Sequence, residues 1–97
     1  METLNYDYPA HTRFARRVHV GVVGSGDLEV LMEPTDAARA SVVINTSVDG
    51  FGTVWKSVID RFFSRFDGQV AIEINDFGAT PGVVLLRLEQ AVEESRS

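Results

Sequence analysis

Hydrophobic and polar residues alternate in four short runs of this chain. Such alternation, with a period of two, is typical of β-strands that bury one face. The runs cover approximately residues 17–23, 28–33, 40–47 and 69–75. In the last run, Val70, Ile72 and Ile74 all fall on one face. We therefore predict four strands, and we interpret residues 1–16, which are mixed in character, as an N-terminal arm or a short edge strand.

Between the third and fourth runs the hydrophobic period becomes that of a helix. Hydrophobic side chains recur at the spacing i, i+3, i+4 in Phe51, Val54, Trp55, Val58, Ile59, Phe62, Phe63 and Phe66. This spacing predicts a strongly amphipathic helix, which we expect to end at Asp67-Gly68 with the glycine as its cap. A second helix is expected to run from Pro81 to about Glu93, with Thr80 as its capping residue.

The predicted order of elements is β-β-β-α-β-α, in one domain that covers residues 1–97. This order indicates an α+β fold, a two-layer α/β sandwich in which both helices cover one face of a mixed sheet. Short turns reverse the first three strands, and the first helix returns the chain for the fourth. Residues 24–27, 48–52 and 75–82 should therefore meet at one edge of the sheet, where the N-termini of both helices favour an anion.

The composition of the chain excludes or disfavours several classes of function. The chain has no cysteine, which rules out a disulfide, a thiolate metal site and a cysteine nucleophile. Its net charge of −5 argues against nucleic-acid binding, which needs a basic surface. No apolar stretch is long enough for a membrane helix, and the polar N-terminus does not look like a signal peptide. We expect a soluble, cytoplasmic protein.

A serine stands between two glycines, Gly24-Ser25-Gly26, where the first predicted strand ends. Because both neighbours lack side chains, its hydroxyl should be open to a large partner. It could be a nucleophile, a turn residue or an attachment point. The glycines do not fit a dinucleotide fingerprint, a P-loop or a hydrolase elbow, since position 29 is Glu29, no Gly-Lys-Ser/Thr occurs, and the glycines directly adjoin the serine.

No group in the sequence is placed to activate this serine. His19 lies six residues away along a strand, roughly 20 Å, and is expected on the solvent side. Neither it nor His11 has a partner at metal-ligand spacing. We expect Asp27, Glu29 and Glu33 to be exposed; Asp27 adjoins the serine loop, and with Glu29 and Asp49 it is a candidate docking contact. An exposed serine without catalytic partners describes a carrier better than an enzyme.

Three segments resemble a known family. They are Val-Gly-Ser-Gly-Asp-Leu-Glu-Val-Leu (residues 23–31), Ser-Val-Asp-Gly-Phe-Gly (47–52) and Glu-Ile-Asn-Asp-Phe-Gly-Ala-Thr-Pro-Gly-Val-Val (73–84). They are similar to the acyl carrier protein, or delta subunit, of biotin-independent malonate decarboxylase. The similarity covers about residues 4–93.

The resemblance implies a non-catalytic carrier whose Ser25 is esterified to 2′-(5″-phosphoribosyl)-3′-dephospho-CoA, with Gly24, Gly26 and Asp27 beside it. The thiol of that group would hold acetyl, exchanged for malonyl, during transfer and decarboxylation. The implied partners are acyl-transferase (alpha) and decarboxylase (beta and gamma) subunits, a malonyl transferase and the prosthetic-group transferase. A citrate-lyase-type carrier and a non-catalytic interaction module remain the alternatives.

Overall fold

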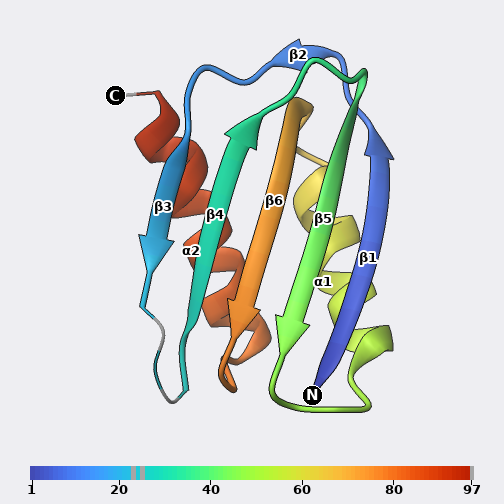
Figure 1. The fold of residues 1–97 in the computed structure, drawn as a ribbon, viewed down its shortest axis with the longest axis vertical. Coiled ribbons are helices and arrows are strands. Elements are labelled where there is room, and N and C mark those ends of the chain that lie inside the picture. The colour runs from blue at the N-terminus through green and yellow to red at the C-terminus, as the bar shows by residue number, and fades with distance from the viewer. Residues whose placement is uncertain (23, 25, 97) are drawn as a thin grey trace.

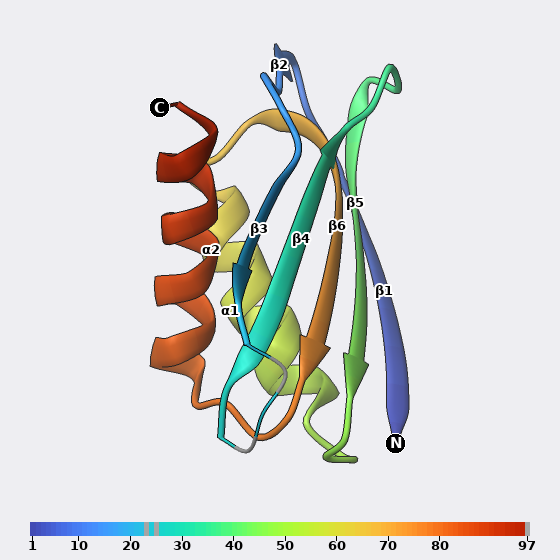
Figure 2. The same ribbon diagram turned by 60° about the vertical axis from the view of Figure 1, so that its left-hand side comes forward.

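A sheet and two helices form two layers in the computed structural model of this chain (Figures 1 and 2). The structure describes residues 1–22, 24 and 26–96. The strands are β1 (Glu2–Pro9), β2 (Thr12–Arg13), β3 (Val18–Gly21), β4 (Leu28–Pro34), β5 (Arg39–Thr46) and β6 (Gly68–Asp76). The helices are α1 (Gly52–Phe63) and α2 (Pro81–Ser95).

The strands lie in the order β1-β5-β6-β4-β3, and β2 pairs separately with the start of β6. β5 and β6 are parallel and are joined through α1, whereas β1–β5, β4–β6 and β3–β4 are antiparallel. Both helices cover the same face of the sheet (Figure 2). The predicted α+β sandwich with a mixed sheet is confirmed.

The strand directions define two opposite edges of the sheet. β3, β5 and β6 all end at the bottom of Figure 1. We call this end of the strands the lower edge, as distinct from the edge strands β1 and β3. It comprises the β3–β4, β5–α1 and β6–α2 connections. The opposite edge, with β2 and the β4–β5 and α1–β6 connections, is the upper edge. The prediction that residues 24–27, 48–52 and 75–82 share one edge is confirmed for the described residues among them.

The N-terminal segment is an edge strand, the second of its two interpretations, and it is longer than expected. All eight residues of β1 pair with β5, from Glu2 opposite Thr46 to Pro9 opposite Arg39. Five strands thus precede α1, where the sequence suggested three. The half-buried face of β1 includes Leu4, Tyr6 and Tyr8, and the intervening polar residues, which are poor strand formers, obscured the pattern.

The predicted end of the first helix was wrong. α1 ends at Phe63, with Ser64 as its cap in the ordinary right-handed conformation, and Gly68 is instead the first residue of β6. A Cβ atom on Gly68 would overlap the ring of Phe66, so this glycine makes room for an aromatic side chain. The start of α2 is as predicted, because Thr80 Oγ1 accepts a hydrogen bond from Val83 N at 3.3 Å.

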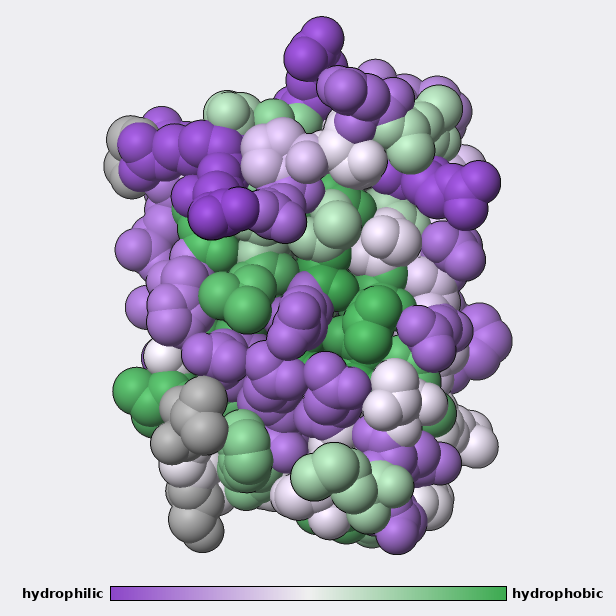
Figure 3. All heavy atoms as spheres, in the orientation of Figure 1, coloured by the Kyte–Doolittle hydropathy of each residue, from purple (hydrophilic) through white to green (hydrophobic). Residues whose placement is uncertain are grey.

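The core lies between the sheet and the helices. It contains fully buried side chains from both layers, including Val30, Ile44, Ile59, Ile74 and Leu88. The other face of the sheet is open to solvent. Figure 3 shows that this face carries a hydrophobic patch surrounded by polar residues.

Candidate functional site

The three connections of the lower edge are hydrogen-bonded to one another. The backbone N–H of Gly26 donates to Phe77 O at 2.8 Å, and Phe77 N donates back to Asp27 O at 2.9 Å. On the other side, Ser47 N donates to Asp76 O at 3.1 Å. The β3–β4 and β5–α1 connections are therefore both fixed to the end of β6.

The β3–β4 connection contains the two glycines that flank the candidate serine. Gly26 has a φ of +77°, a conformation that a residue with a side chain adopts only with strain. No atom outside the local chain lies within 4 Å of where a Cβ of Gly24 would be. Val23 and Ser25 lie outside the described residues, so the role assigned to Ser25 stays a prediction. The described glycines leave space on both sides of that position.

Asp27 is not the exposed carboxylate that the sequence suggested. Its side chain is 20% exposed and accepts two hydrogen bonds from Arg87 of α2, at 2.8 Å from Nη2 and 3.2 Å from Nε. It also accepts from Leu28 N at 2.7 Å. These bonds, with Arg87 first, lower the pKa of Asp27 below its usual value. The pair joins the loop to α2, and it occupies the carboxylate that was expected to contact partners.

Glu29 is likewise only 18% exposed, because it belongs to a row of side chains on the open face. One residue from each of five strands takes part: Thr3, Asn45, Asn75, Glu29 and His19. His19 lies on the solvent side, as predicted, with Nε2 at 2.9 Å from a Glu29 oxygen. Of the three candidate docking carboxylates, only that of Asp49 is well exposed, at 69%.

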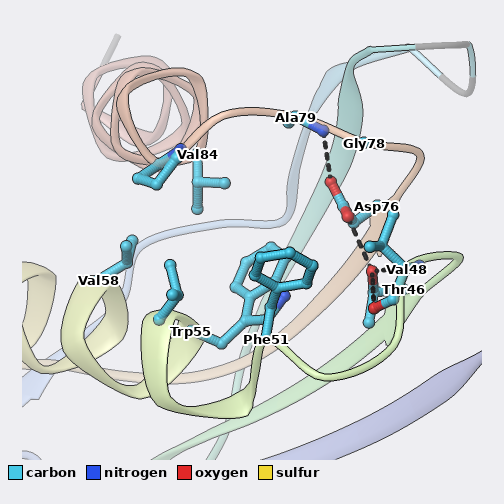
Figure 4. A pocket seen from close by; sticks show the side chains of 11 residues that line it. Thr46, Val48, Phe51, Trp55, Val58, Asp76, Gly78, Ala79 and Val84 are labelled. Atoms are coloured by element: carbon cyan, nitrogen blue, oxygen red, sulfur yellow. Dashed lines mark hydrogen bonds between the residues drawn. The ribbon is translucent and has the colours of Figure 1, made fainter.

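A buried carboxylate lies at the centre of the lower edge. Asp76 is 4% exposed, and it accepts hydrogen bonds from Thr46 Oγ1 at 2.9 Å and from Ala79 N at 3.0 Å (Figure 4). Thr46 Oγ1 in turn accepts from Val48 N at 3.1 Å. These bonds shape both connections that lead into helices, β5–α1 and β6–α2.

A pocket of about 330 Å³ opens beside this carboxylate, between the first turns of α1 and α2. Most of its lining is hydrophobic: Val48, Phe51, Val54, Trp55, Val58, Ala79, Pro81 and Val84. Thr46, Asp76 and Gly78 complete it. Figure 4 shows the labelled side chains around the open space. The helical spacing of the hydrophobic residues of α1 predicted an amphipathic helix but gave no signal for this pocket.

The two helix N-termini at the lower edge differ. Thr80 caps α2, whereas Phe51 precedes α1 without a side-chain hydrogen bond to its first turn. Neither first turn contains an acidic residue. The edge is thus compatible with a negatively charged group such as a phosphate ester.

The described residues contain no group of three or more His, Asp or Glu side chains that could hold a metal ion. Neither of the two helices in this part of the chain is long and apolar enough to cross a membrane.

Comparison with known proteins adds a second line of argument. A family model described as malonate decarboxylase delta subunit (MdcD) matches residues 15–95. A malonate decarboxylase acyl carrier protein of Azotobacter vinelandii is 50% identical over 95 residues, which are 97% of this chain and 96% of the relative. One of the same name from Pseudomonas savastanoi pv. phaseolicola is 52% identical over 98 residues, with the same shares of both chains.

A solved structure agrees with these sequences. A chain in the crystal structure of a Pseudomonas malonate decarboxylase hetero-tetramer in complex with malonate has 48% identity and a TM-score of 0.92. The match covers 98% of this chain and 99% of that one. Both of these relatives are named as acyl carrier proteins. This chain belongs to the malonate decarboxylase delta subunit family, which confirms the resemblance drawn from its motifs.

Two features of the lower edge were not predicted from the sequence. Arg87 lies one position before the buried Leu88 in α2, and nothing in the local pattern connects it with Asp27, 60 residues earlier. Thr46 and Asp76 end adjacent parallel strands and are paired in register. Polar residues at the ends of parallel strands are a signal that could have identified them.

Proposed function

We propose that this chain is a non-catalytic acyl carrier of a malonate decarboxylase, and that Ser25 is the residue to which its prosthetic group is attached. The family membership supports the carrier role. Gly24 and Gly26, which leave space on both sides of position 25, support the attachment site. The chain has no cysteine, so a thioester would have to be carried on an added group.

The proposed group is 2′-(5″-phosphoribosyl)-3′-dephospho-CoA, which would supply the thiol that carries the acyl group. The described residues fit a phosphodiester at this place. No acidic side chain lies in the first turn of α1 or α2, and the charge of Asp27 is balanced by Arg87. Gly24, Gly26 and Asp27 would frame the linkage, and the first turn of α1 at the same edge has no side-chain cap on its backbone N–H groups.

The proposal includes partners and a location. The carrier would visit an acyl-transferase (alpha) subunit, the decarboxylase (beta and gamma) subunits, a malonyl transferase and the enzyme that attaches the group, all in the cytoplasm. The relative in a malonate decarboxylase hetero-tetramer supports a multi-subunit assembly. Because a carrier has to leave each partner, its contacts should be modest in strength.

The attachment is tested by the mass of the intact chain and of its peptides, after production together with the modifying enzymes. The wild type should gain the mass of the group on the peptide that contains Ser25. Ser25→Ala should lose the modification completely. Ser47→Ala is the matched control, because Ser47 is an exposed serine at the same edge whose backbone alone makes the bond to Asp76. It should be modified like the wild type.

Three results would contradict the proposal. A Ser25→Ala chain that still gained the mass would place the attachment elsewhere. A wild-type chain that stayed unmodified would favour the interaction module, in which Gly24-Ser25-Gly26 is only a turn. Modification by a citrate-lyase system but not by a malonate decarboxylase system would favour the other type of carrier.

A further inference from the structure

The pocket of the lower edge has a hydrophobic rim that is partly exposed. Phe51, Val54 and Val48 are 49%, 42% and 38% exposed, although all three are hydrophobic and line the same pocket. Trp55, deeper in the pocket, is only 6% exposed. An apolar pocket with an apolar rim and a few polar groups is the usual form of a site for a small uncharged ligand.

The pocket adjoins the loop that contains the proposed attachment point. Gly78 lines the pocket, and a Cβ placed on it would lie 3.9 Å from the Cα of Gly26. The hydrogen bond from Gly26 N to Phe77 O fixes this contact. A flexible arm attached one residue from Gly26 would therefore start beside the rim.

We infer that this pocket receives the uncharged acetyl-thioester end of the carrier's own prosthetic arm and rejects the malonyl form. The inference rests on the proposed attachment at Ser25. Tethering holds the end of the arm at an effective concentration of about 1 mM or more. Even millimolar intrinsic affinity is then enough for substantial occupancy, so a shallow apolar pocket suffices.

The chemistry of the lining explains the discrimination between the two acyl groups. An acetyl group is small and neutral, and it gains from burial against Val58, Val84 and Trp55. A malonyl group ends in a carboxylate, which loses its hydration in such a pocket. There it would also face Asp76, whose two carboxylate oxygens already accept hydrogen bonds from Thr46 and Ala79. The malonyl end would therefore stay in solvent, accessible to the decarboxylase.

Trp55 is the single tryptophan of the chain and reports directly on the pocket. The first experiment titrates the unmodified chain with S-acetyl-N-acetylcysteamine and with its malonyl counterpart, following Trp55 fluorescence and amide shifts. The acetyl compound should bind roughly tenfold or more tightly than the malonyl compound. The second experiment compares the modified chain in its acetyl and malonyl forms. Only the acetyl form should change the fluorescence of Trp55.

The variants are Ala79→Leu, which fills the pocket, and Ala71→Leu as a matched control. Ala71 is a half-buried alanine on the open face of the sheet, away from the pocket. Ala79→Leu should remove the Trp55 response to acetyl, and Ala71→Leu should keep it. Circular dichroism tests whether both variants are folded. If Ala79→Leu is unfolded, Val54→Leu, at an exposed position on the rim, replaces it.

The outcomes separate this inference from the proposed function. If the mass of the group is absent from Ser25, the proposed function fails. If the group is present but the acetyl form leaves Trp55 unchanged, or if acetyl and malonyl compounds bind equally, the inference is overturned. A filled pocket that weakens binding of another subunit while the acetyl response persists would assign the pocket to a protein partner, and would also overturn it.

Discussion

The upper and lower edges of the sheet differ in the residues that form them. At the upper edge aromatic rings pack on one another: Tyr8 stacks on Phe63 at 4.2 Å, and Phe62 stacks on Phe66 at 4.9 Å between ring centroids. At the lower edge lie all the described residues with positive φ, which are Gly21, Gly26, Gly50 and Gly78. The upper edge gains stability from buried aromatic area, whereas the lower edge has turns that require glycine and an open pocket beside the β3–β4 loop.

The largest expected effect is on the free energy of unfolding, when phenylalanine is replaced by alanine at the upper edge and, for comparison, at the lower edge. Phe62→Ala removes a ring that is 7% exposed and in contact with two others, and it should lower the free energy of unfolding by about 3–5 kcal/mol. Phe51→Ala removes a ring that is 49% exposed and should cost about 1 kcal/mol. Denaturant unfolding measures both. Equal losses would mean that the lower edge also contributes to stability.

The next pair of substitutions distinguishes the role of backbone conformation in the β3–β4 loop from the access of the modifying enzyme to position 25. Gly26→Val forces a β-branched residue into a φ of +77° and should cost about 1–3 kcal/mol. Gly24→Val meets no neighbouring atoms and should cost less than about 0.5 kcal/mol. Attachment of the prosthetic group, followed by mass, should be slowed strongly in both variants.

Two results would correct this account of the loop. If Gly26→Val loses stability and attachment in equal measure, that glycine is purely structural. If Gly24→Val is modified as fast as the wild type, the open space beside position 25 has no role in access by the modifying enzyme.

The smallest effect concerns the pair that fixes the loop to α2. Arg87 lowers the pKa of Asp27, so the pair stabilises the fold at pH values above about 3.9, where an unfolded aspartate is ionised. The stabilisation is lost as the pH falls through the lower pKa of the folded state. Asp27→Asn should therefore be less stable than the wild type at pH 7, and the difference should shrink in acid.

The matched control is Asp36→Asn, which neutralises an exposed carboxylate in the β4–β5 connection at the upper edge. Its stability relative to the wild type should change little between the two pH values. A difference for Asp27→Asn that grows in acid would show that the pair does not act through the ionised carboxylate.

The sequence was most informative where a period is repeated. The helical spacing from Trp55 to Phe62 and the alternation in β6 predicted the two layers. The short turns between the first strands and the helical crossover predicted the strand directions, and these in turn predicted the shared lower edge. β1 was harder to predict, because Asn5 and Asp7, which alternate with its hydrophobic residues, are poor strand formers. The end of α1 was misplaced because Phe66 continues the helical spacing but packs on Phe62 from beyond the helix.

The candidate site was predictable only in part. Gly24 and Gly26 could be found because two closely spaced glycines at the end of a predicted strand indicate a turn. The pair of Asp27 and Arg87 and the pocket beside Asp76 depend on contacts between distant segments, which local patterns do not contain. The surroundings of Asp27 changed its expected role: a carboxylate that looked free for docking is occupied by an arginine of α2.

The sheet order has a consequence for the time at which the loop takes shape during folding. β3 and β4 can pair early, since they are neighbours along the chain, but β1 needs β5 and β4 needs β6. Closing such long loops is slow. The bonds of Gly26 and Asp27 to Phe77 form only after β6 has entered the sheet. A modifying enzyme that recognises the finished loop would thus distinguish mature chains from nascent ones.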